Sequence, residues 1–314
     1  MDRENSVQAI LRKAEECGFC AAGFSAVAPC TEENTRLQDM IRENRHGEML
    51  YMQNNIASRD NPENLLPGAK TVFSAAMPYH FLLDTRAKSG RFSRYAMVRD
   101  YHRVLSEKLE EVLAFIRKNL SGEVNGKVCV DGMPVFEKSW AEKAGLGRQG
   151  KNTMLIVPEK GSLVFLGEIL LDIELPFTPQ QLDDPCGECC ACIKSCPTGA
   201  IIEKGKIDAR KCISYLTVEL KREFTPEESA MTGEWLFGCD ICQEVCPHNQ
   251  ESLKEKTATG FEPQEALLTI TPEEILSLSR SQFKKLFAAT PVYRTGLKRL
   301  KRNARAVLEN LKEC

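Results

Sequence analysis

The residues with the most evident chemistry are cysteines in two runs between positions 186 and 246. The first run has the spacing C-x2-C-x2-C-x3-C and the second has C-x2-C-x3-C, and each ends in a Cys-Pro pair. Both match the bacterial ferredoxin pattern, in which thiolates hold iron–sulfur clusters. The second run lacks its first cysteine, and Cys212, which lies between the runs, can supply it.

Eight of these cysteines can be assigned to two [4Fe-4S] clusters. In two-cluster ferredoxins, the fourth cysteine of a run binds the cluster of the other run. The sequence therefore predicts one cluster held by Cys186, Cys189, Cys192 and Cys246, and a second held by Cys196, Cys212, Cys239 and Cys242. Cys190 is left over, because its neighbour Cys189 already has the C-x2-C spacing to both Cys186 and Cys192. A pair of zinc knuckles is the alternative, and the repeated Cys-Pro pair argues against it.

A second candidate site lies in residues 130–153. Asp131 is expected to end a short strand over 127–131, and the glycine-rich segment that follows carries Arg148 and Lys151. Such a segment can offer backbone N–H groups to an anion. A partly buried carboxylate beside it would have a raised pKa and would serve as a proton donor. A tight turn with a solvated aspartate is the alternative.

The elements that must position these residues follow from patterning. Apolar residues at helical spacing predict a strong helix over 101–120, and other helices are expected over about 32–45, over 137–145 and from about 297. Segment 71–79 has the pattern of a buried strand, and the strands on either side of residues 159–161 are expected to pair. We expect an α/β (α+β) domain over 1–180, a two-cluster ferredoxin-like domain over 181–260 and a helical segment over 261–314.

The composition limits the class of protein. The 314 residues carry a net charge of −2 and include 14 cysteines. The N-terminus has no apolar signal core and no run of eighteen apolar residues occurs, so we expect a cytoplasmic protein without membrane contact. Cysteines in such a chain indicate metal binding more than disulfides.

Several stretches resemble the epoxyqueuosine reductase family. They include VDGMPVFEKSWAEKAGLGRQGKNTMLI, both cysteine runs, SRDNPENLLPGAKTV and YRTGLKRLKRNARAVLENL, and they follow the family's order over nearly the whole chain. The family uses cobalamin and two [4Fe-4S] clusters for the last step of queuosine synthesis in tRNA. The resemblance implies a tRNA substrate carrying epoxyqueuosine, an external low-potential electron donor and a monomer.

The resemblance also implies roles for single residues. Asp131 matches the family's proton donor. Cobalamin contacts are implied for Arg59, Ser93, Asp131, Leu155, Leu166, Ser214 and Asp240. His102 stands in DYHRVL, which lacks the glycine of the D-x-H-x-x-G cobalamin motif, so we interpret it as a helix-start or packing residue. Electrons would pass from the clusters to cobalamin, and Asp131 would protonate the departing epoxide oxygen.

The C-terminal helix is locally basic in a weakly acidic chain. We expect four of its residues to contact tRNA phosphates: Lys298, Arg299, Lys301 and Arg302. A solvated helix end is the alternative. Two rival functions also fit the cysteines: a cobalamin-dependent reductase of a small molecule, similar to reductive dehalogenases, and a non-catalytic electron-transfer subunit.

Overall fold

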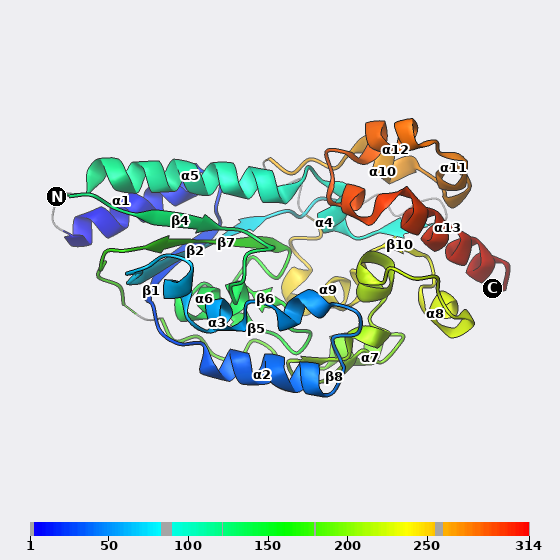
Figure 1. The fold of residues 1–314 in the computed structure, drawn as a ribbon, viewed down its shortest axis with the longest axis horizontal. Coiled ribbons are helices and arrows are strands. Elements are labelled where there is room, and N and C mark those ends of the chain that lie inside the picture. Colours follow the sequence, from blue (N-terminus) through cyan, green and yellow to red (C-terminus); the bar gives the residue numbers. More distant parts are fainter. Residues whose placement is uncertain (1–2, 83–89, 121, 179, 255–259, 314) are drawn as a thin grey trace. The chain divides into compact units, whose positions relative to one another are not determined.

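The computed structural model describes residues 3–82, 90–120, 122–178, 180–254 and 260–313. They form two compact units, each built from separate stretches of chain (Figure 1). The first unit contains Met1–Asn44, Tyr51–Pro78 and His102–Glu188, and the second contains Arg45–Leu50, Tyr79–Tyr101 and Cys189–Cys314. Two units thus replace the three expected domains, because the helical segment from 261 belongs with the cysteine-rich block.

The first unit is organised by a four-stranded sheet of order β1-β2-β7-β4. Every neighbouring pair in it is antiparallel. The mixed fold is confirmed, with the α+β arrangement. The strands are β1 (Ala21–Ala26), β2 (Thr71–Pro78), β7 (Val164–Leu171) and β4 (Gly126–Cys129).

Helices cover both faces of this sheet (Figure 1). Helix α5 (Tyr101–Asn119) buries an apolar stripe that includes Leu109 and Leu113. It lies so close to the sheet that a Cβ added at Gly167 would come within 2.7 Å of Leu109. Helix α6 (Glu137–Lys143) packs on the opposite face, where Trp140 is fully buried. The remaining helices of this unit are α1 (Arg3–Glu16), α2 (Thr31–Arg42) and α3 (Ile56–Asp60).

One predicted strand pairing is wrong. The strands around 159–161 meet only at a single bridge between Val157 and Gly161. Strand β6 (Leu155–Ile156) instead pairs with β5 (Arg148–Gln149), while β7 inserts between β2 and β4. In the central sheet the long apolar β7 pairs along both edges, and α5 and α6 cover its two faces.

The second unit contains short elements around the cysteines and a helical C-terminal part. Parallel strands β3 (Arg91–Phe92) and β10 (Trp235–Phe237) pack with α13 (Gly296–Glu313). Three of its helices begin with a capping box, which satisfies their first N–H groups locally. The other elements are α4 (Arg94–Met97), α7 (Ala191–Ser195), β8 (Ile201–Glu203), β9 (Lys206–Ile207), α8 (Pro226–Met231), α9 (Ile241–Glu244), α10 (Glu265–Thr269), α11 (Pro272–Ser277) and α12 (Arg280–Phe287).

Candidate active site and cluster ligands

Asp131 lies in a turn two residues beyond the end of β4. Its Oδ2 atom is 3.1 Å from Nε2 of His102 in the first turn of α5. Its backbone N–H donates to Oε1 of Glu137 at 2.8 Å. The Asp131 side chain is 41% exposed, so this carboxylate is partly buried, as expected. His102 lies at the start of α5, as predicted, and it also holds the carboxylate predicted to be the proton donor.

The unit that contains Asp131 also has two buried carboxyl groups, those of Glu137 and Glu168. Burial, followed by the negative charge of Asp131, raises the pKa of Glu137 to about 7. Glu168, in the middle of β7, is 0% exposed, and burial raises its pKa well above the ordinary value, with a further contribution from Glu137. Sequence reasoning missed both residues. The signal was available, because Glu168 is the one charged residue in the apolar strand VFLGEILL.

Arg59 is the cation that faces these carboxyl groups from α3. Burial lowers the pKa of its guanidinium, while the charges of Tyr51 and Glu137 act in the opposite direction. The Nε atom of Arg59 is buried without a hydrogen-bond partner among the described residues. The side chain therefore has a donor to offer to a group beside Asp131.

The glycine-rich segment forms a hairpin, and its expected role as an anion site is wrong. The N–H groups of Gln149, Gly150 and Thr153 already donate to Glu142, Met154 and Gly150, respectively. Gly147 is needed because a Cβ there would lie 2.3 Å from the carbonyl oxygen of Ile156.

The same hairpin contacts a predicted cluster ligand. The backbone N–H of Lys151 donates to Sγ of Cys186 at 3.3 Å, and Lys151 Nζ donates to the carbonyl of Gly187 at 2.8 Å. Hydrogen bonds to cluster sulfurs are one of the means by which a protein sets a cluster's reduction potential. The loop is therefore suited to position and tune a thiolate.

The predicted ligands of the second cluster lie together within the second unit. Burial raises the pKa of the Cys239 thiol, and so do the neighbouring thiols of Cys242 and Cys212. Cys212 in turn has its pKa raised by burial and by Cys196. These effects connect all four cysteines predicted to share one cluster.

Helices α7 and α9 pack against each other and carry Cys192 and Cys242. Cys196 accepts a hydrogen bond from the N–H of Ala200 at 3.3 Å. Cys190 occupies the N-cap position of α7, and its side chain makes no capping hydrogen bond there. No three His, Cys, Asp or Glu side chains in the described ranges are arranged to hold a single metal ion.

Two of the predicted cobalamin contacts form a buried network in the second unit. Ser93 and Asp240 are each 1% exposed, and the serine hydroxyl donates to Oδ1 of Asp240. The N–H of Arg94 donates to the other carboxylate oxygen at 2.7 Å, and its guanidinium bonds Glu244 at 2.8 Å. Both side chains are thus already engaged within the protein. Ser214 is partly exposed.

Arg302, predicted to contact tRNA, is instead a structural residue. It is 3% exposed, and its guanidinium donates to the carbonyls of Leu216, Leu220 and Arg222 and to the side chain of Asn303. These carbonyls belong to the segment that follows Cys212. Arg302 thereby anchors the chain next to a predicted cluster ligand.

Arg299 has a similar role on the same helix. Its guanidinium donates to the carbonyls of Val218, Thr295 and Arg294 at 2.6 to 2.9 Å. Burial lowers the pKa of Arg299. Of the four predicted tRNA contacts, Lys298 is exposed and Lys301 is half-buried, so these two remain accessible to a ligand.

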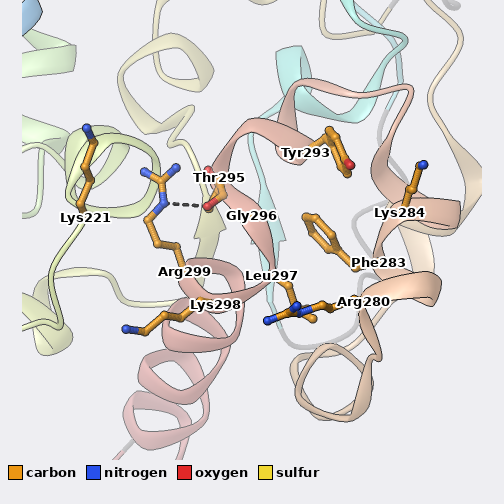
Figure 2. A pocket seen from close by; sticks show the side chains of 10 residues that line it. All are labelled: Lys221, Arg280, Phe283, Lys284, Tyr293, Thr295, Gly296, Leu297, Lys298 and Arg299. Atoms are coloured by element: carbon orange, nitrogen blue, oxygen red, sulfur yellow. Dashed lines mark hydrogen bonds between the residues drawn. The ribbon is translucent and has the colours of Figure 1, made fainter.

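A basic pocket of ≈ 770 Å³ lies where α12, α13 and Lys221 meet (Figure 2). Four exposed cations line it: Lys221, Arg280, Lys284 and Lys298. None of the four forms an ion pair with a described residue. Tyr293 stacks on Phe283 at its rim, with ring centroids 5.5 Å apart. Sequence reasoning missed three of the four cations, because they lie far apart in the chain or on another helix.

Comparison with known proteins identifies the class and then the family. Residues 185–249 match a 4Fe-4S double cluster binding domain, which makes the chain a two-cluster iron–sulfur protein. Residues 59–132 match the epoxyqueuosine reductase QueG domain (DUF1730). The chain is 38% identical to the epoxyqueuosine reductase of Cellulophaga algicola over 301 residues, which cover 96% of this chain and 97% of the relative. It is 36% identical to that of Escherichia coli over 319 residues, covering 99% and 82%.

Solved structures give the same result. A crystal structure of epoxyqueuosine reductase with an epoxyqueuosine-modified tyrosine tRNA stem loop has a TM-score of 0.90 and 29% identity, covering 100% of this chain and 83% of that one. The enzyme from Streptococcus thermophilus has a TM-score of 0.87 and 30% identity, covering 97% and 81%. The chain belongs to the epoxyqueuosine reductase family and is an oxidoreductase. No helix in the described ranges has the length and apolar character of a membrane span.

Proposed function

We propose that this protein reduces epoxyqueuosine to queuosine in tRNA. The observation that carries the proposal is the likeness, over the whole chain, to an epoxyqueuosine reductase solved with its modified tRNA stem loop. The reaction consumes two electrons and two protons and releases the epoxide oxygen as water. The two-cluster domain suits delivery of single electrons from an external low-potential donor.

The predicted ligand sets stand as our assignment for the two clusters. The mutual effects among Cys196, Cys212, Cys239 and Cys242 support one set. For the other, the support is the ferredoxin spacing of Cys186, Cys189 and Cys192 with Cys246, together with the N–H directed at Cys186.

Cobalamin is the second cofactor that we propose. The unpartnered Nε of Arg59 fits it, because cobalamin carries amide side chains whose oxygens accept hydrogen bonds. Leu166 is partly exposed, whereas Leu155 is 3% exposed and would contribute mainly packing. Ser93, Ser214 and Asp240 remain predicted contacts of the second unit. When bound, cobalamin would supply the low-valent cobalt chemistry that opens the epoxide.

Within this proposal Asp131 delivers a proton to the departing oxygen. An alkoxide is a poor leaving group, so a positioned acid accelerates the step. His102 holds the Asp131 carboxyl at 3.1 Å, and Glu137 holds its backbone N–H. The two contacts fix the direction in which the proton is presented.

For the tRNA contact, we revise the set of residues predicted from sequence. Lys298 joins Lys221, Arg280 and Lys284 around one pocket, where four unpaired cations suit the phosphates of an RNA backbone. Lys301 remains a candidate on the same helix. Arg299 and Arg302 are set aside, because their guanidinium groups are already bonded to backbone carbonyls.

The proposal is tested by mass analysis of tRNA nucleosides from a strain that lacks the gene. Epoxyqueuosine should accumulate and queuosine should disappear, and the wild-type gene should restore queuosine. A normal queuosine content would favour the small-molecule reductase instead. Purified protein without any cobalamin and without activity would favour the electron-transfer subunit.

A further inference from the structure

The face of the sheet that α6 covers holds a buried carboxyl group between two apolar clusters. Along β7, Leu166 and Leu170 point into two apolar clusters on this face. Glu168 lies between them, and its cross-strand neighbours are Ser74 on β2 and Cys129 on β4. A residue with a purely structural role at this position would be apolar like its two neighbours.

The Glu168 carboxyl is unsatisfied. Both of its oxygens are buried without a hydrogen-bond partner among the described residues, and the same is true of Ser74 Oγ. Ionising an isolated carboxyl group in such a place is costly, so the resting protein keeps this group protonated. A buried acid that keeps its proton at neutral pH and makes no structural bond is a proton store.

Glu137 connects this store to Asp131. Its carboxyl accepts the N–H of Asp131 at 2.8 Å. Trp140, one turn further along α6, packs in one buried cluster with Cys129, which is the cross-strand neighbour of Glu168. The charged groups that face Glu137 are Asp131, His102 on α5, Lys138 on its own helix and Arg59 on α3. Those that face Glu168 are Glu137 on α6 and the thiol of Cys129 on β4.

We propose that Glu168 and Glu137 form a proton relay that recharges Asp131 within a turnover. The inference rests on the proposed function, in which two protons are consumed while the Asp131 carboxyl carries only one. After Asp131 gives its proton to the departing oxygen, the proton of Glu168 passes by way of the Glu137 carboxyl to the Asp131 carboxylate. Asp131 then supplies the second proton, which completes the water. Solvent refills the pair between turnovers, and the electrons come from the external donor through the clusters.

The first test needs neither cobalamin nor substrate. At about pH 8, where ordinary carboxyl groups are ionised, infrared spectra of the protein should contain the carbonyl band of a protonated acid that disappears in Glu168→Gln. Glu107→Gln, which changes an exposed carboxylate on α5, should leave that band unchanged. A band that survives in Glu168→Gln would show that Glu168 stores no proton, whatever the role of Asp131.

The second test is the pH profile of single-turnover reduction in protein with full iron and cobalamin content. Glu168→Gln should be about tenfold slower at about pH 8 and unchanged at about pH 6, where solvent protons replace the store. An equal loss at both pH values, or no loss at either, would overturn the relay. Glu168→Asp, which keeps the acid, should recover part of the alkaline rate, and it serves if the glutamine variant does not fold. A wild-type rate in Asp131→Asn would instead remove the proposed function of Asp131.

Discussion

Two buried polar groups, Arg302 with Asn303 in the second unit and Glu168 in the first, have opposite surroundings. In the second unit, Arg302 and Asn303 are buried, and their donors all have backbone carbonyl or side-chain acceptors. In the first unit, Glu168 is equally buried and neither oxygen has a partner among the described residues. Fully satisfied networks rigidify a fold, whereas an unsatisfied buried carboxyl is a cost that function has to explain. The contrast separates a scaffold for the cluster ligands from a site with proton chemistry.

The largest effect is expected in the first unit, from replacing Asp131, the predicted proton donor. Asp131→Asn keeps the shape of the side chain but removes the transferable proton, so single-turnover reduction of epoxyqueuosine tRNA should slow by about 10²–10⁴-fold. Iron and cobalamin contents should not change. Asp39→Asn, an exposed change on α2, is the control and should react at the wild-type rate. A normal rate in cofactor-replete Asp131→Asn would leave solvent as the proton source.

In the second unit, loss of one predicted ligand cysteine should remove one iron–sulfur cluster. Wild-type protein purified without oxygen should hold about eight irons, and Cys212→Ala should hold about four. Cys190→Ala is the matched control and should keep about eight. Iron analysis and the visible absorbance of the clusters give the answer. The opposite pattern, with iron lost from Cys190→Ala alone, would overturn the ligand assignment.

The hydrogen-bonded network around Arg302 should matter for the stability of the second unit rather than for tRNA binding. Arg302→Ala leaves several buried carbonyls without donors and should lower the free energy of unfolding of the second unit by about 3 kcal/mol. Arg305→Ala, on the same helix, breaks only an exposed ion pair with Glu223 and should cost about 0.5 kcal/mol or less. In a Trp140→Phe background, Trp235 reports on this unit alone. Equal stabilities of the two variants would contradict the anchoring role.

The unsatisfied carboxyl pair should leave a signature in stability against pH. The pKa of Glu137 is raised to about 7, so the folded state binds more protons than the unfolded chain between its ordinary pKa and that value. Stability should therefore decrease as pH rises through this window, by about 3 kcal/mol. Glu137→Gln should flatten the decrease, measured with Trp140 as the reporter in a Trp235→Phe background. An unchanged slope would show that Glu137 is ionised throughout.

The smallest effect per residue is expected at the basic pocket. Replacing Lys221, Arg280, Lys284 and Lys298 by Ala should weaken tRNA binding and reduce the slope of log affinity against log salt by about 3. A control that removes four charges from the first unit, at Lys13, Lys70, Lys108 and Lys118, should keep most of the slope. If both variants lose equally, net charge rather than this pocket determines binding.

Much of the fold was predictable because its signals are local. Apolar residues at helical spacing predicted α5 to within a residue or two at each end, and the buried run at 71–79 predicted β2. The strand pairing across 159–161 was not predictable in this way. Tight-turn spacing favours a hairpin, but burial of both faces of β7 in the central sheet stabilises the chain more than a local pairing.

The residues of the candidate site also differ in whether a local signal in the sequence could predict them. Sequence by itself predicted which cysteines hold the clusters, because the spacing of ligands two or three residues apart is a local signal. Only the tertiary structure decided which polar residues act together. His102 and Asp131 are 29 positions apart in the sequence, and several strands separate Glu137 from Glu168 along the chain. These residues come together only when the sheet forms. The charges in a sequence also do not show which face of a helix is buried. Only the structure shows that Arg302 is buried and anchors the chain, whereas Lys298 is exposed.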